Sequence, residues 1–496
     1  MFKFIKKLIV KKKNIWFLIA VIIIGFIAIP TFHILSTKWN EEDTSYTIPK
    51  GFTDDASQLN LTKVDTIIEV PNDKKEIENQ LKSILKYAKE NQLKISIAGA
   101  KHSMGGHTIY PNGIVLNMLP YKQMELDSLN NILTIGSGAL WKDAIQYLDK
   151  YDKSIAVMQA FSSFSVGGSI SVNGHGWQKD LPPIASSVVS FTLMTESGEI
   201  KNCSRTENQE LFHLVIGGYG LFGIILDVKL KVVDNLALQY KYIKLSPKNY
   251  VSYYKKYISE NPNVNLVFGR LRISDKLFLE EATLNFFEKV NAPIPVLQNQ
   301  KSTETQRLVF RGSVDSEYGK RLRWDLETSM NKVSKNDVYS RNDLLNDHVS
   351  LIENKDKNST DLLQEYFIPE KNFNQYLEDI KPILKNSKID LLNITIRGVH
   401  KDNDSYLCYA KENVFGFVLL FNQKKTDKQE AEMKKLTNQL VDVALKNGGT
   451  FYLPYRLHID KNKMRKSYPN ADQFFQLKLK YDPSELFNNK FYEHYK

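Results

Sequence analysis

Cysteine is almost absent from this sequence, since Cys203 and Cys408 are the only two among 496 residues. Two cysteines cannot form a disulfide framework, and their spacing matches no zinc-ligand motif. We assign them to different domains, so we expect no bridge between them and interpret both as small buried residues. The sequence therefore predicts neither a disulfide-stabilised fold nor a metal centre.

A basic surface for nucleic acid is also missing, although lysine and arginine exceed aspartate and glutamate by 11. Six of the lysines lie within residues 1–13, and the others are scattered among acidic residues in the pattern of a solvated surface. No stripe of basic residues with interleaved aromatic residues stands out. We expect no nucleic-acid partner.

The usual phosphate-loop signatures are absent as well. The chain has no P-loop lysine motif, and neither of its two main glycine clusters has the G-x-G-x-x-G form that begins the helix of a Rossmann site. These clusters are the turn of residues 98–107, which follows a strand-like run, and the stretch of residues 165–176. Because glycines let main-chain N–H groups converge on an anion, the pair indicates a bound dinucleotide held in another way.

One long uncharged run is present, over residues 15–35. About 20 apolar residues suffice to span a bilayer as a helix. A cleaved signal peptide, the alternative, has a shorter apolar region and an A-x-A cleavage site that is not evident here. We therefore favour an uncleaved transmembrane anchor over residues 14–36. The basic tail before it would be cytoplasmic, which places the body of the protein on the periplasmic or extracellular side.

The rest of the chain is long enough for two hydrophobic cores. Asn72 or Asp73 is a candidate cap for a helix between the strand-like runs 65–70 and 93–97. Its apolar residues fall on one face at helical spacing: Ile77, Leu81, Ile84, Leu85 and Ala88. A strand pair is predicted around residues 188–200. Strands and helices mix without a strict βαβ repeat, which indicates an α+β fold.

From about Val233 the composition changes, because glycine becomes rarer while tyrosine and lysine become more frequent. A glycine pair near residue 448 precedes the last segment. We divide the chain as follows: basic tail 1–13, anchor 14–36, linker 37–60, first domain 61–233, second domain 234–447, and a returning C-terminal segment 448–496.

Four motifs occur in a fixed order: G-x-K-H-S-x-G-G, S-V-G-G-S-I-S-V-N-G-H-G, E-L-F-H-L-V-I-G-G-Y-G-L-F-G-I-I and K-L-K-Y-D-P-S-E-L-F. This set resembles the FAD-dependent oxidoreductases of the vanillyl-alcohol oxidase type, with their p-cresol methylhydroxylase-type (PCMH-type) FAD domain. The resemblance covers residues 61–233 and 448–487. It implies a two-subdomain FAD-binding domain, an α+β substrate (cap) domain between its two parts, and FAD as cofactor.

The resemblance also assigns segments to the cofactor. The turn at 98–106 would wrap the FAD pyrophosphate, residues 165–176 would line the pyrophosphate and flavin, and residues 217–225 would close over them. The implied FAD-binding residues are Ala98, Gly99, Ala100, Lys101, His102, Ser103, Met104, Gly105, Gly106, Ser165, Val166, Gly167, Gly168, Ser171, Gly174, His175, Gly176, Gly218, Gly220, Gly223, Ile224 and Ile225.

His102 falls where aldonolactone oxidases, alditol oxidases and cytokinin dehydrogenases carry a histidine bonded covalently to the flavin. The resemblance thus implies a covalent link through His102. Lipid-linked ribose oxidases have a similar turn with a different residue there, so His102 departs from their pattern. A turn histidine satisfied by main-chain hydrogen bonds is the alternative. We interpret His107 as a polar turn residue, and His175 as part of the cofactor site.

Candidate catalytic residues come from three further segments. Gln364–Pro369 resembles the M-E-Y-x-x-P segment of aldonolactone oxidases, which points to Glu365. The strand Asn393–Arg397 resembles their E-x-R strand and would place Arg397 beside the flavin. Thr395 stands where that motif has glutamate, so the aldonolactone mechanism does not carry over directly. Tyr455 lies where the ribose oxidases have an active-site lysine, and His458 follows as a reserve candidate.

Hydride transfer from a CH–OH group to flavin needs a base for the hydroxyl proton and a donor near the developing negative charge. We therefore expect oxidation of a sugar, polyol, lactone or lipid-linked sugar, with oxygen or a membrane quinone as electron acceptor. Two alternatives remain: a flavin reductase supplied by NAD(P)H, and a non-catalytic membrane-tethered binding protein that keeps the fold.

Overall fold

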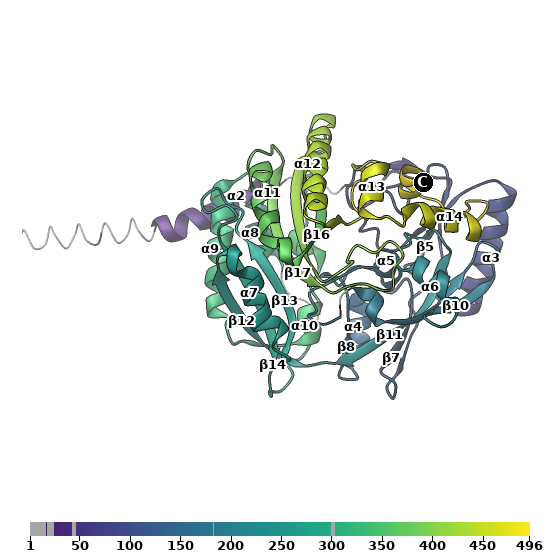
Figure 1. The fold of residues 1–496 in the computed structure, drawn as a ribbon, viewed down its shortest axis with the longest axis horizontal. Coiled ribbons are helices and arrows are strands. Elements are labelled where there is room, and N and C mark those ends of the chain that lie inside the picture. The colour runs from purple at the N-terminus through teal and green to yellow at the C-terminus, as the bar shows by residue number, and fades with distance from the viewer. Residues whose placement is uncertain (1–15, 17–23, 42–45, 182, 299–302) are drawn as a thin grey trace, which may run out of the picture.

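The polypeptide forms two bodies, each built around β-sheets, and the two bodies face each other across a cavity. The computed structural model describes residues 16, 24–41, 46–181, 183–298 and 303–496. The chain forms an amino-terminal half first and then crosses to a central domain between β11 (Ile224–Asp234) and β12 (Ala237–Leu245). After α12 (Asp427–Lys446) it returns to the amino-terminal half (Figure 1).

A strand–helix–strand unit begins the amino-terminal half. β3 (Thr66–Glu69), β5 (Ile114–Asn117) and β4 (Ile95–Ala98) form a parallel sheet in that order. The connecting helix α3 (Lys74–Glu90) is capped by Asp73, whose carboxylate accepts two main-chain N–H bonds. This cap confirms one of the two residues predicted for it. The predicted apolar face is confirmed too, because the buried residues of α3 are Ile77, Leu81, Ile84, Leu85 and Ala88.

The second subdomain is an antiparallel sheet in the order β10-β9-β11-β7-β6, with β8 paired to β11. Its strands are β6 (Met124–Asp127), β7 (Ile132–Gly136), β8 (Lys153–Ile155), β9 (Val188–Met194), β10 (Ile200–Ser204) and β11. The β9–β10 pair is the hairpin predicted around residues 188–200. Three helices contribute buried side chains to its core: α4 (Trp141–Asp149), α5 (Val166–Ser171) and α6 (Gln209–Val215).

The central domain is an eight-stranded antiparallel sheet in the order β15-β12-β14-β13-β17-β18-β16-β19. Its remaining strands are β13 (Val264–Leu271), β14 (Ala282–Lys289), β15 (Val338–Ser340), β16 (Ser359–Pro369), β17 (Asp390–Val399), β18 (Val414–Lys424) and β19 (Thr450–Phe451). One face of this sheet is turned toward the amino-terminal half, and we call the sheet the cap sheet.

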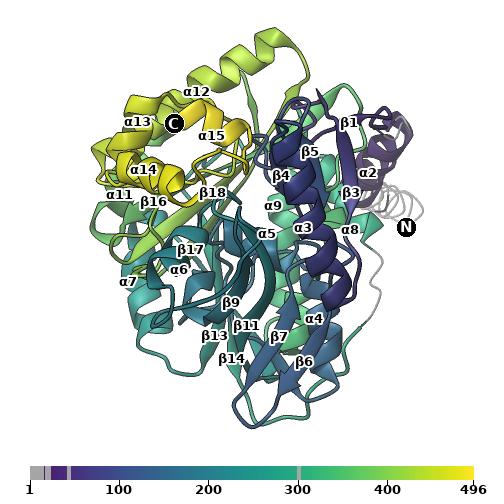
Figure 2. The same cartoon turned by 90° about the vertical axis from the view of Figure 1, so that its right-hand side faces the viewer.

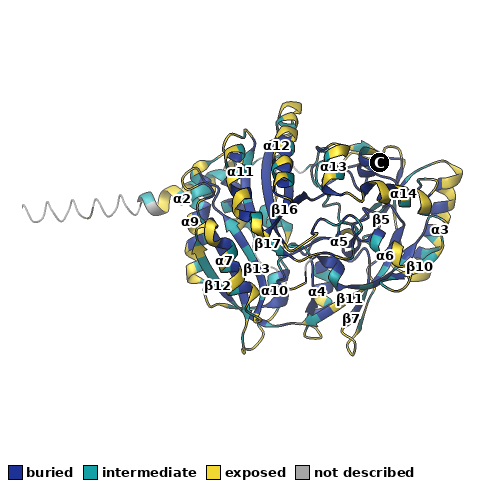
Figure 3. Ribbon diagram, in the orientation of Figure 1, coloured by how far each residue is buried: buried dark blue, intermediate teal, exposed yellow. Residues whose placement is uncertain are grey.

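Helices cover the cap sheet on both faces. On one face lie α7 (Tyr250–Tyr254), α11 (Phe373–Lys385) and α12, where Tyr250 stacks on Phe373 and Phe373 packs on Phe417 of β18. On the other lie α8 (Glu304–Arg311) and α9 (Glu317–Val333), and Phe310 of α8 packs on Leu392 and Leu420. Figure 3 shows the strands buried beneath helices whose outer faces are exposed. The second face is only partly covered, which leaves room for the cavity.

The C-terminal segment lies over the amino-terminal half. It comprises α13 (Lys461–Ser467), α14 (Ala471–Tyr481) and α15 (Lys490–Tyr495), drawn in yellow in Figures 1 and 2. Ile95 of β4 forms a parallel bridge with Phe487, and the main-chain N–H of Asn488 donates to the carbonyl of Ile95 at 3.0 Å. The last residues thus extend the sheet that carries the first glycine turn.

The described part of the amino end begins with η1 (Ile24–Ala28) and α2 (Ile29–Asn40). α2 lies on α8, and His33 Nε2 is 2.8 Å from the carbonyl oxygen of Gly312. The expected membrane span also includes residues 14–15 and 17–23, which lie outside the described residues. Within the described ranges, no helix combines the length and the apolar character needed to cross a membrane.

Residues 46–60 differ from the polar linker that we expected over residues 37–60. Asp54, Asp55 and Ser57 are buried. Asp55 Oδ2 accepts the main-chain N–H of Gly106 at 2.7 Å and the side-chain amide of Asn60 at 2.7 Å. The composition looked like a tether because it is polar. Asp55 and Asn60 instead bind main-chain groups of the glycine turn, and Asp54 and Ser57 bind groups within residues 46–60.

Candidate functional site

A large cavity lies between the amino-terminal half and the cap sheet. It encloses about 1780 Å³ of space free of protein atoms, including the part open to solvent. Both predicted glycine segments line it, as do β13, β16, β17 and β18 of the cap sheet and residues 452–455 of the returning segment. The cavity therefore brings together residues that are up to 358 positions apart, from Ile97 to Tyr455.

The two glycine segments touch each other at the cavity wall. A Cβ on Gly99 would lie 2.0 Å from Ser165 Oγ, and the main-chain N–H of Ala100 donates to that oxygen at 3.2 Å. Only glycine permits this approach, because any side chain at position 99 would displace Ser165. In the second segment, Val166–Ser171 forms the short helix α5.

The predicted cofactor residues divide into those that line the cavity and those that do not. The lining ones are Gly99, Ala100, Lys101, His102, Ser103, Ser165, Gly167, Gly168, Ser171, His175, Gly220, Gly223 and Ile225. The others are Ala98, Met104, Gly105, Gly106, Val166, Gly174, Gly176, Gly218 and Ile224.

Three of the residues away from the cavity contact other parts of the protein. Met104 donates its N–H to the carbonyl of Pro454 at 2.8 Å. A Cβ on Gly105 would lie 2.5 Å from the carbonyl oxygen of Tyr455. Gly106, with φ of +66°, packs under the side chain of Lys490. This end of the turn positions the C-terminal segment, and so it brings Tyr455 to the cavity.

Close packing also explains the other non-lining residues. Ala98, Val166 and Ile224 are fully buried in the core. A Cβ on Gly174 would lie 2.7 Å from the Gln159 side chain, one on Gly176 2.0 Å from the Met158 carbonyl, and one on Gly218 2.1 Å from the Leu214 carbonyl. These glycines support the backbone that surrounds the site.

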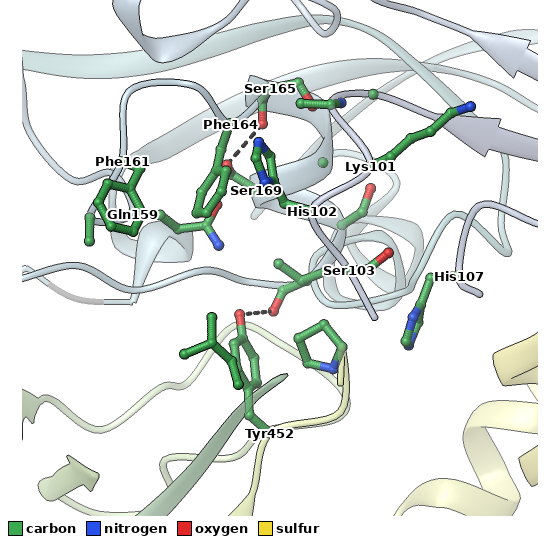
Figure 4. Close-up of a pocket in the computed structure, with 18 of the residues that line it drawn as sticks. Lys101, His102, Ser103, His107, Gln159, Phe161, Phe164, Ser165, Ser169 and Tyr452 are labelled. Atoms are coloured by element: carbon green, nitrogen blue, oxygen red, sulfur yellow. Dashed lines mark hydrogen bonds between the residues drawn. The ribbon is translucent and has the colours of Figure 1, made fainter. Parts of the chain in front are cut away.

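His102 is set into the cavity wall. Its ring centre lies 4.1 Å from that of Phe164, and Figure 4 shows the ring beside Phe164 and Ser165 and away from His107. Burial lowers the pKa of His102 to about 4, and the hydrogen bond that its ring donates to the main-chain carbonyl of Ser163 opposes the shift only in part. The imidazole is therefore neutral at pH 7, which leaves a ring nitrogen free to act as a nucleophile.

His107 has a different environment although it also borders the cavity. Its Nε2 lies 3.1 Å from the carbonyl oxygen of Leu453, and its ring stacks on Phe491 with 5.1 Å between ring centres. Burial lowers its pKa to about 3. These contacts anchor the C-terminal segment, in keeping with our interpretation of His107 as a turn residue.

A buried carboxylate lies at the centre of the cap-sheet wall. One oxygen of Glu365 is 2.5 Å from Nε2 of His175, and the other accepts the hydroxyl of Tyr455. Burial alone would raise the pKa of Glu365, but His175, Arg397 and Tyr455 together hold it below its ordinary value. Burial and the Glu365 carboxylate raise the pKa of Tyr455 well above 10. Glu365 is thus an ionised carboxylate that already accepts the hydrogen bond of the Tyr455 hydroxyl.

Arg397 lies in the same wall, on β17. Every second residue of this strand faces the cavity, namely Asn393, Thr395 and Arg397, because side chains alternate between the faces of a sheet. Nη1 of Arg397 is 3.5 Å from the carbonyl oxygen of His175, whereas its buried Nε has no partner among the described residues. This free N–H can donate to an oxygen atom of a ligand.

His458, predicted as a reserve catalytic candidate, does not line the cavity. Its Nε2 is 2.9 Å from a carboxylate oxygen of Glu430 on α12, and its Nδ1 is 2.9 Å from the hydroxyl of Thr437. After Tyr455 the chain turns away from the cavity toward α12. His458 therefore fixes the position of the C-terminal segment.

Several lining residues escaped the sequence analysis. Arg270 comes from β13, while Gln159, Phe161 and Phe164 come from the segment before α5. Tyr452 donates its hydroxyl to the carbonyl of Val172 at 2.8 Å, the bond drawn at Tyr452 in Figure 4. The alternation along β17 could have revealed Asn393. No local pattern marks Arg270, because its place depends on pairing with a strand more than 120 residues later.

Several buried polar atoms of the residues that line the cavity have no hydrogen-bond partner within the described part of the chain. Among the described residues, the buried side-chain atoms without a hydrogen-bond partner include Thr108 Oγ1, Ser137 Oγ and His175 Nδ1, as well as the Nε atoms of Arg270 and Arg397. Buried polar groups are nearly always hydrogen-bonded. The set is therefore typical of a ligand site whose ligand supplies the missing partners.

Comparison with known proteins identifies the cofactor. Residues 75–204 match the family described as FAD binding domain. The chain is 27% identical over 175 residues to cytokinin dehydrogenase 2 of Arabidopsis thaliana, covering 35% of each protein. It is 27% identical over 189 residues to the mitochondrial L-galactono-1,4-lactone dehydrogenase of Arabidopsis thaliana, covering 38% of this chain and 31% of that protein.

L-gulonolactone oxidase of Bos taurus is 27% identical over 161 residues, which cover 32% of this chain and 36% of that protein. The chain thus spans about a third of the length of the curated relatives that it matches. The family match lies within residues 75–204, so the part of the cavity formed by the cap sheet has to be interpreted from its own residues.

Proposed function

Because residues 75–204 contain an FAD-binding domain of the kind found in these oxidases and dehydrogenases, we propose that the protein is an FAD-dependent oxidoreductase acting on a CH–OH group. The observation that carries the proposal is the Glu365 carboxylate. It is buried, it accepts the Tyr455 hydroxyl, and it shares one cavity with the glycine turn of the FAD-binding domain.

The residues of the cavity fit FAD. Ser137 Oγ and Thr108 Oγ1 are buried donors without partners, and they lie along the wall that the glycine turn lines. Gly99–Ser103 and Ser165–Gly168 would hold the pyrophosphate through their main chain, and His175 and Arg397 lie on the cap-sheet side. When bound, FAD supplies the acceptor for a hydride from the substrate.

The residues of this chain would handle the substrate's proton and charge. Tyr455 would take the hydroxyl proton of the substrate as it passes its own proton to Glu365, since the phenol already donates to that carboxylate. Arg397 would donate from its free Nε to the same substrate oxygen and stabilise the negative charge that develops there. His175 keeps Glu365 in place and ionised through the 2.5 Å contact.

We include in the proposal a covalent bond between His102 and the flavin. Its neutral imidazole and its place in the cavity wall support this assignment. The bond would make the cofactor non-dissociable. Denaturation of the purified protein in acid tests it, since a bound flavin stays fluorescent in the protein pellet and a free flavin remains in the supernatant.

For the substrate we propose a sugar, polyol, lactone or lipid-linked sugar, and for the acceptor oxygen or a membrane quinone. Two of the relatives carry lactone-oxidising names, which supports the first choice for this chain. The uncharged run at residues 15–35 supports a single-pass membrane anchor with the enzyme body on the periplasmic or extracellular side. A protease-protection assay on intact cells tests that orientation.

Anaerobic mixing of the purified flavoprotein with a panel of sugars, polyols and lactones tests the activity. We expect at least one compound to bleach the flavin absorption near 450 nm, and the Glu365→Gln variant to bleach far more slowly. Bleaching by NADH or NADPH alone would identify a reductase instead. A protein isolated without flavin would support a non-catalytic binding role and refute the proposal.

A further inference from the structure

Four side chains form one row across the cavity face of the cap sheet. Arg270 of β13 is paired with Thr395 of β17, Thr395 with Val418 of β18, and Val418 with Glu365 of β16. All four line the cavity. Three inter-strand spacings of about 4.8 Å place the Cα atoms of Arg270 and Glu365 roughly 14 Å apart. The row therefore has a carboxylate at one end and a guanidinium at the other.

The guanidinium of Arg270 is only partly paired. Its Nη2 lies 3.2 Å from Glu327 of α9, whereas its Nε is buried and has no partner among the described residues. An unmade hydrogen bond to a buried charged donor is costly. A ligand that accepts from Nε would remove that cost, and an anionic acceptor would do so most effectively.

The charges around Arg270 favour an anion as well. Arg323 of α9 is buried nearby and donates hydrogen bonds to Ser313 and to the Leu392 carbonyl. Among the described residues no carboxylate hydrogen-bonds to it, and Glu327 and Asp390 act on it only through their charge. Arg397 is the third arginine at this wall, against the two carboxylates Glu327 and Glu365. The nearby carboxylate of Asp390 is cancelled by Lys320 at 2.7 Å, so these groups together leave one positive charge, in a site where burial strengthens electrostatic attraction.

Asn393 adds a second unfilled contact. Its Nδ2 donates to Thr395 Oγ1 at 2.9 Å, and its buried Oδ1 has no partner among the described residues. Asn393 and Thr395 lie on the strand between Arg270 and the Glu365 pair. An acceptor here would receive a hydroxyl of the ligand, while the nearby guanidinium groups would bind its anionic end.

From this arrangement we infer that the substrate is a hydroxylated anion of about monosaccharide length, whose carboxylate or phosphate binds Arg270 while its reacting CH–OH lies beside Arg397 and Tyr455. This inference rests on the proposed oxidation at the same site and specifies its substrate class. A hydroxyl oxygen of a neutral polyol could accept from the Nε of Arg270, but only a carboxylate or phosphate oxygen would form the stronger, charge-assisted bond and also offset the positive charge.

Isothermal titration calorimetry of the full-length holoprotein tests the anion site without requiring turnover. The probes are oxalate for a carboxylate, inorganic phosphate for a phosphate, and glycerol as the neutral control. We expect saturable binding of oxalate or phosphate and none of glycerol, and the tighter of the two anions identifies the group. Absence of saturable binding by both anions would overturn the inference.

Three variants assign the binding to Arg270. In Arg270→Gln the anion affinity should fall about ten- to a hundredfold, the worth of one or two charge-assisted hydrogen bonds. Arg270→Lys keeps the charge and should retain part of the affinity. Glu327→Gln removes the neutralising carboxylate and should tighten anion binding. Equal affinity in Arg270→Gln and the unmodified protein would overturn the inference.

Arg272→Gln is the matched control. Arg272 lies two residues from Arg270, pairs with Glu281 at 2.8 Å and does not line the cavity, so its replacement should leave anion affinity unchanged. The proposed oxidation is tested separately by flavin bleaching with D-gluconate, D-glucose 6-phosphate and sorbitol. Arg270-dependent binding without bleaching by any compound refutes the oxidation and keeps the anion site. Bleaching by sorbitol alone refutes the anion preference and keeps the oxidation.

Discussion

The main-chain carbonyl of Tyr455 lies so close to Gly105 that a Cβ at position 105 would be only 2.5 Å from its oxygen. The same Cβ would lie 2.7 Å from Cε1 of His107. The glycine turn that borders the cofactor side of the cavity therefore also sets the position of a catalytic candidate from the C-terminal segment. One side of this turn lines the cavity, and the other side packs on the C-terminal segment, whose Tyr455 also lines the cavity.

Replacing Gly105 should consequently affect both stability and activity. In Gly105→Ala the methyl group has to displace main chain, so we expect a loss of about 1–3 kcal/mol in the free energy of unfolding. Tyr455 would move with its carbonyl, and kcat should fall while FAD content stays nearly unchanged. Urea titration and steady-state kinetics measure the two effects. Gly25→Ala is the control, because no atom of the described residues lies within 4 Å of its added Cβ.

Removal of the His102 imidazole should abolish covalent flavin. His102→Ala is expected to bind FAD through the same main-chain groups, yet to release it into the supernatant on acid denaturation. His107→Ala serves as the matched control. His107 also borders the cavity, but its ring is hydrogen-bonded to the Leu453 carbonyl and stacked on Phe491. If the His102 variant retained flavin in the denatured pellet, the attachment would lie elsewhere.

Local sequence patterns were sufficient for the elements that surround the site. The apolar spacing from Ile77 to Ala88 and the Asp73 cap depend on residues within one helix, and both were predictable. The contact between Gly99 and Ser165 joins two segments that are 66 positions apart, and each glycine run was visible by itself. What could not be predicted was that four of the nine residues from 98 to 106 do not line the cavity and pack against other parts of the protein.

The cap-sheet wall was less predictable, because it depends on the register of strands far apart in the chain. Glu365 and Arg397 were found through their motifs, but the row from Arg270 to Glu365 requires three separate strand pairings. His458 illustrates the same limit. Its proximity to Tyr455 in sequence suggested that it lies in the cavity, but its side chain contacts Glu430, 28 residues earlier, outside the cavity.

The Glu430–His458 pair should therefore affect stability and leave catalysis intact. Burial opposes ionisation of Glu430, but the hydrogen bond from His458 and the charge of Arg456 lower its pKa to about 2. A carboxylate whose pKa is lower in the folded state stabilises the fold above its unfolded pKa of about 4.3, and this contribution is lost as the pH falls toward 2.

Glu430→Gln should thus lower the urea midpoint at pH 6 and reduce its decline between pH 5 and pH 2. His458→Gln should lower the midpoint at pH 6 as well, since it removes the contact with Glu430, and kcat should stay within about twofold. A tenfold or larger loss of kcat in His458→Gln, at full FAD content, would restore His458 as a catalytic residue.

Glu365 and Tyr455 are expected to behave in the opposite way, with large effects on turnover. Glu365→Gln keeps the shape of the side chain but cannot accept a proton, and Tyr455→Phe removes the hydroxyl between substrate and carboxylate. Each should reduce kcat by about 10²- to 10⁴-fold, the usual contribution of general acid–base catalysis. Stopped-flow bleaching of the flavin under anaerobic conditions measures this step directly, and His458→Gln is the control.

The pH dependence of the same step separates the two roles. Because the pKa of Glu365 lies below its ordinary value, the bleaching rate of the unmodified protein should stay constant down to pH 5 and decline only below the ordinary carboxylate pKa of about 4.3. Tyr455→Phe removes a hydrogen bond that favours the ionised carboxylate, so its residual rate should decline at a higher pH. Glu365→Gln should lose this decline altogether. An unchanged acid limb in Glu365→Gln would show that another group takes the proton.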